Sequence, residues 1–376
     1  MKKILLLVIG IVSVSCTEKR KPVEMPNLFV GTYTDGESEG IYRFSFNAET
    51  GELAHDTLVA TLPNPSYLAI SVDGQNLYAI QETANFDSSG GGVTAFKLKE
   101  GLLEHQNSMG TAGAHPCHIA LSDNGNLVVS NYTGGNLIVA DLEAKGSLKG
   151  SPQVIDHKIL DSTSTSHAHM ASFMNDELFV SDLGLDAVKR YVKKDGKYIP
   201  FEAQPSISLP KGAGPRHFVF GQEQRFLYVI NELNSTITVF KKENNGIYTV
   251  VETKNTLAQG FKGKSFCADI HLSQDGKFLY GSNRGENTVV AFKVNQDNGQ
   301  LTLVDRVSVE GDWPRNFTLD PTGKFLLVAN QRSNNICVFK RDVETGTLEF
   351  LSKTNLSAPA CLKFSENRYP KDSTNL

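Results

Sequence analysis

Short runs of alternating hydrophobic and polar residues recur along nearly the whole chain. One group of runs begins at "HFVFG" (217–221) and continues through "RFLYVIN" (225–231) and "STITVF" (235–240), and a fourth run follows a glycine turn. Alternation with a period of two residues is typical of β-strands that bury one face. No segment shows sustained helical periodicity, so the pattern predicts an all-β protein built from groups of four antiparallel strands.

The groups repeat every 45 to 53 residues. A turn of the form x-x-Gly-x-hydrophobic precedes the last strand of each group, and its glycines are Gly51, Gly101, Gly146, Gly196, Gly246, Gly299 and Gly346. Tight turns such as Asp73-Gly74 and Asn124-Gly125 separate the first two strands, because these residues adopt a positive φ at little cost. Seven such units predict a seven-bladed β-propeller, in which four-stranded blades stand radially around a channel.

The two ends of the chain each hold part of one unit. The last unit has only its first strand, "ACLKFS" (360–365), whereas the N-terminal segment begins with a second strand, "NLFVGTY" (27–33), and a third, "GIYRFSF" (40–46). We therefore expect the N-terminal strands to pair with the C-terminal strand and to close the ring. The propeller would span residues 27–366 and leave residues 367–376 as a tail.

The first residues, "MKKILLLVIGIVSVSC", combine two lysines, an apolar run and small residues before a cysteine. The run is too short to cross a bilayer and is typical of a secretory signal. It resembles a bacterial lipoprotein signal, which predicts a signal peptide over residues 1–15, lipidation of Cys16 and a tether over residues 16–26. The protein would then be exported and held at a membrane only by its lipid. Ser13 stands where such signals usually carry an aliphatic residue, so simple cleavage stays an alternative.

Charge and cysteine content narrow the classes of partner. Without residues 1–15 the chain has 35 basic and 41 acidic residues, a net charge of about −6, and no basic block, which argues against nucleic acid. The cysteines beyond Cys16 lack the C-x-x-C spacing of metal or redox sites, and we expect small buried residues at these positions, which are Cys117, Cys267, Cys337 and Cys361. We expect a monomer.

Polar residues gather where the first strand of each unit starts. The residues at this position are Tyr67, His118, His169, His217, Asp269, Asn316 and Cys361. The first strand of a propeller blade is innermost, so they should ring one end of the channel, and the hairpin returns the chain to that end near Glu82, Asp182, Glu232 and Arg284. Asn and Asp that recur there are expected to cap loops. Arg216, Arg315 and others found in one blade only are candidates for a site, with a rim salt bridge as the alternative.

These residues carry a family resemblance. The Pro-x-His and His-x-His strand starts, the "NEL" after "GPRHFVF" and the "SDLGLD" at 181–186 resemble the seven-bladed lactonase family, which includes 6-phosphogluconolactonases and a fungal muconate-lactonizing enzyme. The resemblance implies a metal-independent site at the channel mouth with no cofactor. Its catalytic residues would be His169 (or His167), Arg216, Glu232 and Arg284. The further residues that we expect to bind substrate are His118, His167, His217, Glu82, Asp182 and Arg315.

The chemistry of these residues suits the opening of a lactone. Glu232 or a histidine such as His169 could deprotonate the attacking water or protonate the leaving alkoxide, and the sequence leaves that division open. The arginines would hold the developing oxyanion or an anionic group. A zinc ion at His167 and His169 lacks further ligands, whereas a calcium ion in the channel stays open. "GESEG" (36–40) resembles a serine-nucleophile motif but lies between two strands without the helix that this motif requires.

Three functions therefore remain for comparison. The first is a lactonase that acts on a sugar-type lactone, the second is a cycloisomerase or lyase that acts on a carboxylated substrate, and the third is an exported propeller that binds glycans or proteins without catalysis. The export signal argues against 6-phosphogluconolactone, which is made in the cytoplasm, and favours unphosphorylated lactones.

Overall fold

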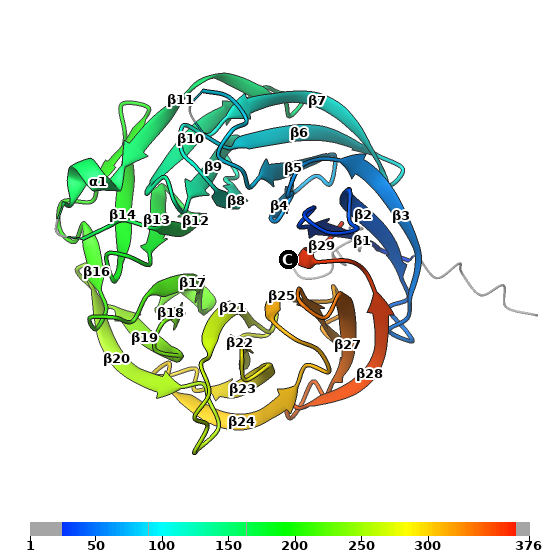
Figure 1. Ribbon diagram of the computed structural model, residues 1–376. Helices are drawn as coiled ribbons and strands as arrows, with labels where there is room; N and C mark the ends of the chain where they lie inside the picture. Colours follow the sequence, from blue (N-terminus) through cyan, green and yellow to red (C-terminus); the bar gives the residue numbers. More distant parts are fainter. Residues whose placement is uncertain (1–24, 89, 163, 366–376) are drawn as a thin grey trace, which may run out of the picture.

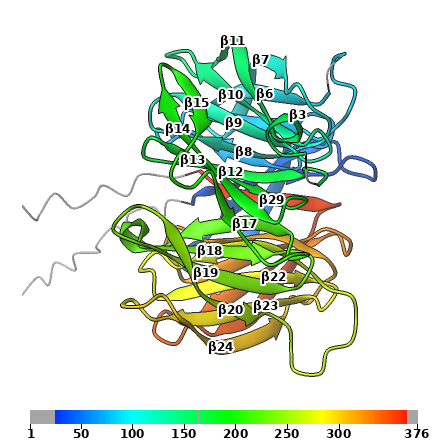
Figure 2. The same cartoon turned by 90° about the vertical axis from the view of Figure 1, so that its left-hand side faces the viewer.

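Seven twisted β-sheets stand around a central channel in the computed structural model of the chain (Figure 1). The structure describes residues 25–365 except 89 and 163. The signal segment, Cys16 and the C-terminal tail predicted for residues 367–376 lie outside the described residues. Figure 2 shows the ring from the side, with the sheets around β8 and β12 above those around β17 and β22. The prediction of a seven-bladed all-β propeller is confirmed.

Each blade has four antiparallel strands, ordered from the channel outward. Blade 1 holds β4 (Leu68–Ile70), β5 (Asn76–Gln81), β6 (Gly92–Lys99) and β7 (Leu102–Gly110). Blade 2 holds β8 (Pro116–Leu121), β9 (Asn126–Asn131), β10 (Asn136–Leu142) and β11 (Leu148–Asp156). Blade 3 holds β12 (Ala168–Met174), β13 (Glu177–Asp182) and β14 (Ala187–Lys194), and its outer edge is shared by β15 (Lys197–Pro200) and β16 (Ser206–Ser208).

The remaining blades follow the same plan. Blade 4 holds β17 (Pro215–Phe220), β18 (Phe226–Asn231), β19 (Thr236–Lys242) and β20 (Tyr248–Asn255). Blade 5 holds β21 (Phe266–Leu272), β22 (Phe278–Arg284), β23 (Thr288–Val294) and β24 (Leu301–Ser308). Blade 6 holds β25 (Pro314–Leu319), β26 (Phe325–Asn330), β27 (Asn335–Arg341) and β28 (Leu348–Asn355). The two short helices are α1 (His157–Leu160) and η1 (Gln222–Gln224).

Blade 7 is shared between the two ends of the chain, as the sequence predicts. Its order from the channel outward is β29 (Pro359–Phe364), β1 (Asn27–Thr32), β2 (Gly40–Phe46) and β3 (Leu53–Thr61). β1 pairs with β29 in a register that sets Val30 opposite Leu362. Both side chains are buried in the core between blades 6 and 7, so ring closure rests on hydrophobic burial as well as on strand pairing.

The repeated glycine turns explain why the spacing is so regular. Gly346 has a φ of 78°, which favours glycine. A Cβ atom there would lie 2.3 Å from the ring of Phe278 in the neighbouring blade. The carbonyl oxygen of Gly346 also accepts a hydrogen bond from the buried Tyr280 hydroxyl, and Gly146 plays the same part for Tyr78. These turns join neighbouring blades, and the position therefore requires glycine for two reasons.

Most inner strands contain a β-bulge near their first residues. The register of β8 shifts between Pro116 and His118, and that of β17 shifts between Pro215 and His217. A bulge places two residues of one strand opposite one of its partner and interrupts the alternation of side chains. Consecutive residues such as Arg216 and His217 can therefore both line the channel.

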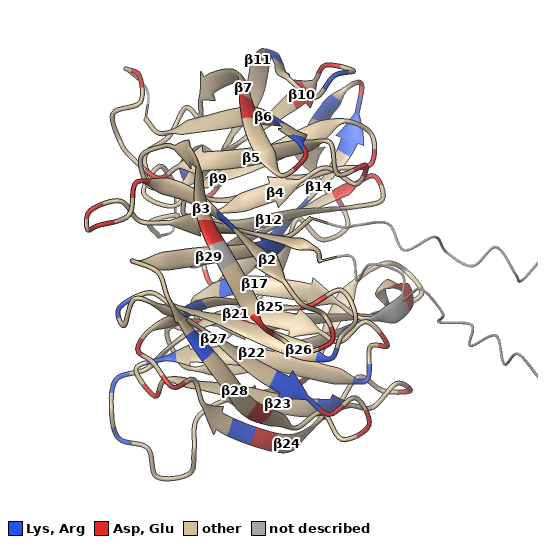
Figure 3. Cartoon of the chain, turned by 90° about the vertical axis from the view of Figure 1, so that its right-hand side faces the viewer, with Lys and Arg blue, Asp and Glu red and all other residues tan. Residues whose placement is uncertain are grey.

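The outer surface carries charges of both signs. Figure 3 shows Lys and Arg interspersed with Asp and Glu over the side in view, which agrees with the nearly balanced composition. The four cysteines of the described region are free and buried, as expected. No helix within this region is long and apolar enough to cross a membrane.

Candidate active site

A polar cavity of about 180 Å³ opens at the end of the channel where the inner strands start. We call it the front chamber, and all seven blades contribute to its lining, which consists of Tyr33, Glu82, Cys117, Tyr132, His169, Arg216, Glu232, Arg284 and Arg315. Six of these nine residues are candidates from the sequence, including all four predicted catalytic residues. The fold therefore brings together groups that lie as far apart as residues 82 and 315.

Glu232 binds two arginines in this chamber. It directly follows β18, and its backbone N–H donates to Gly214 O at 2.7 Å, which fixes it beside the start of β17. Its Oε2 atom lies 2.8 Å from Arg284 Nη2 and 3.1 Å from Arg216 Nε. The Nε–H of Arg216 does not point at this oxygen, so that contact is an ion pair without a hydrogen bond.

Both arginines are also held from behind by backbone carbonyls. Arg216 Nη1 donates to Ala268 O at 2.6 Å, and Arg284 donates to Cys267 O at 3.0 Å and packs over the ring of Trp313. Burial lowers the pKa of Arg284 to about 10, and the nearby Glu232 opposes this effect. Arg284 therefore remains a cation at neutral pH. The two guanidinium groups are fixed before any substrate arrives, which favours electrostatic stabilisation of a developing anion.

His169 lines the front chamber as a neutral imidazole. Its side chain is buried, and its Nδ1 atom has no hydrogen-bond partner among the described residues. Burial, together with Arg216 and His217, holds the pKa of His169 well below its usual value. His167 is placed differently: it stacks on the ring of Tyr132 at 4.5 Å and its Nδ1 lies 3.1 Å from Tyr132 O. The geometry thus favours His169 over His167 as the histidine of the chamber.

A second polar cluster faces the chamber from blades 1, 6 and 7. The Tyr33 hydroxyl donates to Glu82 Oε2 at 2.7 Å, and Ser66 Oγ donates to the same oxygen. Arg315 Nη2 lies 3.8 Å from this carboxylate, and its guanidinium packs 5.1 Å from the centre of the Tyr33 ring. Burial raises the pKa of Tyr33, so its hydroxyl stays protonated. This wall offers a cation, a carboxylate and a hydroxyl to a polar ligand.

Other candidates from the sequence lie elsewhere. Asp182 is fully buried, accepts from His157 Nδ1 at 2.6 Å and from Ser166 Oγ at 2.5 Å, and caps the turn after β13 through backbone N–H groups. The structure does not bring it to the front chamber. His118 and His217 lie deeper in the channel and face away from this chamber, because the bulges of β8 and β17 direct Cys117 and Arg216 to it instead. The expectation that one ring of seven residues lines one mouth is therefore met by His169 alone.

Tyr33 and Tyr132 are lining residues that the sequence reasoning did not select. Both directly follow the second strand of a blade, which is also the position of Glu82 and Glu232. This shared position was the signal that could have identified them. Tyr33 was missed because its blade is split between the two ends of the chain, so its alignment with the other units becomes clear only once the ring is closed.

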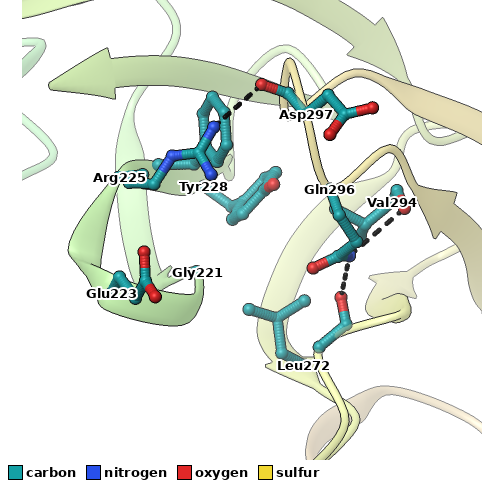
Figure 4. A pocket seen from close by; sticks show the side chains of 10 residues that line it. Gly221, Glu223, Arg225, Tyr228, Leu272, Val294, Gln296 and Asp297 are labelled. Carbon is teal, nitrogen blue, oxygen red and sulfur yellow. Dashed lines mark hydrogen bonds between the residues drawn. The ribbon is translucent and has the colours of Figure 1, made fainter. Parts of the chain in front are cut away.

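Another hollow, of about 170 Å³, lies between blades 4 and 5 (Figure 4). Its polar groups largely bind protein atoms: Arg225 Nη2 donates to Asp297 O at 3.0 Å, and Gln296 Nε2 donates to Gly276 O at 2.8 Å. These contacts join the two blades and leave the front chamber as the stronger candidate. In residues 25–365, with 89 and 163 left aside, no three His, Cys, Asp or Glu side chains are placed to hold a metal ion.

Comparison with known proteins identifies the family. Residues 27–364 match the family model described as "Lactonase, 7-bladed beta-propeller". The chain is 35% identical to the 6-phosphogluconolactonase of Bacillus subtilis over 78% of this chain and 85% of that protein. It is 37% identical to the 6-phosphogluconolactonase of Formosa agariphila over 78% of this chain and 86% of that protein.

The solved structures agree with these relatives. The periplasmic gluconolactonase of Pseudomonas aeruginosa superposes with a TM-score of 0.85 at 34% identity, over 91% of this chain and 99% of that one. The fold, the front chamber and the matched length lead to one conclusion: the chain belongs to the seven-bladed β-propeller lactonase family.

Proposed function

We propose that the protein hydrolyses a sugar-type lactone in the front chamber. The observation that carries the proposal is the grouping of Glu232, two preorganised arginines and the neutral His169 around one small cavity. Relatives named as 6-phosphogluconolactonases and as a gluconolactonase support hydrolysis over the cycloisomerase and the non-catalytic alternatives. The cavity of about 180 Å³ has the volume of about six water molecules in the liquid, which suits a substrate with a single ring.

Glu232 is proposed as the group that moves the proton. Its carboxylate takes a proton from the water that attacks the lactone carbonyl, and the carboxylic acid then returns this proton to the alkoxide as the ring C–O bond breaks. Arg216 and Arg284 hold the carbonyl oxygen as it becomes an oxyanion. His169, with a free ring nitrogen in the same chamber, orients the water or a substrate hydroxyl. No cofactor or metal ion enters this scheme.

The opposite wall is proposed to select the substrate. Arg315, Glu82 and Tyr33 present donors and acceptors at the distance of a ring from the catalytic groups. Three arginines against two glutamates leave one positive charge in excess in the chamber. A polyhydroxylated lactone, neutral or anionic, is therefore favoured over a cation.

Localisation and assembly complete the proposal. We propose that residues 1–15 export the protein, that Cys16 carries the lipid, that residues 16–26 tether the propeller of residues 27–366, and that the protein works as a monomer without nucleic acid. The similarity to a periplasmic gluconolactonase supports export. Cys16→Ala should move the protein from the membrane fraction to the soluble exported fraction. Retention of this variant at the membrane would contradict the lipid anchor.

Acid release from lactones tests the activity directly. The protein should hydrolyse glucono-δ-lactone, measured at constant pH by titration, at the same rate with and without a metal chelator. An exported enzyme should prefer this lactone to 6-phosphogluconolactone, and the reverse preference would overturn the assignment of the unphosphorylated substrate. If the folded protein hydrolyses neither these lactones nor γ-lactones above the buffer rate, the proposed function is wrong.

A further inference from the structure

The channel holds a second and larger cavity, of about 480 Å³, behind the front chamber. We call it the back chamber. It is lined by the later residues of the inner strands, among them Ile70, Leu121, Val219 and Phe364. Its inner end is formed by the rings of Tyr67, His118 and His217, which pack against one another with centroid separations of 4.3 to 6.0 Å. The two chambers are thus separated by little more than one layer of side chains.

The polar groups at this inner end have no protein partner. His118 is 3% exposed, and its Nδ1 atom is buried without a hydrogen bond. Neither its other ring nitrogen nor the Tyr67 hydroxyl has a hydrogen bond to any described residue. Buried polar groups are nearly always paired with protein or with ordered molecules, and an unpaired group costs free energy. Both side chains line the back chamber and not the front one, so a partner would come from the back.

A lysine supplies charge at the same place. Lys363, on β29, has its Nζ atom 4.9 Å from the centre of the Tyr67 ring. Across the described residues, no carboxylate oxygen lies within salt-bridge distance of this ammonium group. The nearby carboxylate of Asp269 is already engaged, because it accepts from His217 Nδ1 at 2.7 Å, His271 Nε2 at 3.0 Å and the backbone N–H of Phe317 at 3.2 Å.

The remaining walls of the back chamber are mostly aliphatic or aromatic. A cavity with apolar walls and a few convergent polar groups at one end is the usual form of a small-molecule site. The end groups here are one cation, one hydroxyl and one neutral imidazole, which together suit a carboxylate. Burial holds the pKa of His118 well below its usual value, with His217 and Lys363 adding to the effect, so this imidazole is neutral and adds no charge of its own.

We propose that the back chamber binds a small organic carboxylate, with its anionic group at Lys363, Tyr67 and His118 and its apolar body along the channel wall. This site is separate from the front chamber and does not depend on the proposed lactone hydrolysis. The carboxylate would satisfy the unpaired groups from the side on which they are accessible.

Binding of benzoate, measured by titration calorimetry on the full-length mature protein, tests the proposal. Benzoate should bind, whereas the uncharged benzyl alcohol should not. Lys363→Gln should weaken benzoate binding at least tenfold, and Tyr67→Phe, which keeps the ring, should weaken it severalfold. Lys340→Gln, which changes an exposed lysine on β27, is the matched control and should leave binding unchanged.

The front chamber must be excluded as the place of binding. Arg284→Gln removes a cation from the front chamber only and should leave benzoate binding within twofold of the parent. The proposal is overturned if benzoate does not bind, if binding survives Lys363→Gln unchanged, or if Arg284→Gln abolishes it instead. Thermal melting confirms that each variant is folded, and Tyr67→Phe gives the answer if Lys363→Gln is not.

Discussion

Replacement of Glu232 by glutamine separates a catalytic carboxylate from a structural one. Glutamine keeps the size and most of the hydrogen bonding of the side chain but cannot take a proton from water. If Glu232 is the base, turnover should fall by roughly 10² to 10⁴. The same substitution removes the negative charge between Arg216 and Arg284, which are both almost fully buried, so stability should fall as well.

The loss of stability can be sized from the contacts. Removal of one partner of a fully buried ion pair costs about 3–5 kcal/mol. The Glu232 side chain keeps 18% of its surface exposed, and both arginines retain backbone carbonyl partners, so we expect the lower end, about 3 kcal/mol. The entropy of unfolding is about 2.1 cal/mol/K per residue, or about 0.7 kcal/mol/K for a propeller of about 340 residues. The Tm should therefore fall by about 4 °C.

A matched variant isolates the effect on catalysis. Glu177 pairs with the fully buried Arg190 at 2.6 Å and is about as exposed as Glu232, but it lies on β13 and does not line the front chamber. Glu177→Gln should lower the Tm by a similar amount and leave turnover per folded molecule unchanged. Initial rates on glucono-δ-lactone, corrected for the folded fraction, give the comparison. If Glu232→Gln keeps turnover within twofold of the parent while losing the same stability as Glu177→Gln, Glu232 is structural and the assignment fails.

Three further predictions address the substrate wall, the ring closure and the buried histidines. Arg315→Gln should raise KM severalfold with little change in kcat, because it removes a substrate contact and leaves Glu232 in place; a fall in kcat alone would contradict this role. Deletion of residues 358–376 removes β29, leaves β1 without its inner neighbour and exposes a strand edge, so no soluble protein with a cooperative melt should be obtained, and a native-like melt would refute closure. Burial, with Arg216 adding to it, lowers the pKa of His217 to about 4; an unfolded histidine binds a proton below about 6.5, so stability should be greatest above that pH and fall by about 3 kcal/mol between pH 6.5 and 4, whereas equal urea midpoints at pH 7 and 4.5 would exclude a neutral His217.

The fold could be predicted almost completely because its determinants are local and repeated. Each unit carries its own hairpin signals, its own alternating strands and a glycine that the neighbouring blade requires, as Gly346 shows against Phe278. A single unit would be weak evidence, but seven units at one spacing leave few other architectures. The split blade followed from the same counting, since the only strands without partners were those at the two ends.

The site could be predicted only in part, because its geometry depends on a departure from the repeat. Strict alternation along an inner strand assigns Arg216 and His217 to opposite faces, whereas the bulge in β17 lets both line the channel, one in each chamber. The sequence marks no bulge directly, so the position of a residue in the column did not decide which chamber it faces. His169 illustrates the point, since it occupies the same column as His118 and yet lines the front chamber.

The partition of the channel has a consequence for the chemistry. His217 Nδ1 donates to Asp269, so its Nε2 atom is left to accept from Arg216 Nη1 at 3.2 Å. Asp269 in turn accepts from His271, which reaches the back chamber. Arg216 is therefore held in place by a chain of hydrogen bonds that crosses the layer between the chambers. The precision of the front chamber thus depends on residues that no substrate in it would touch, which is why the polar residues of the column extend beyond the catalytic set.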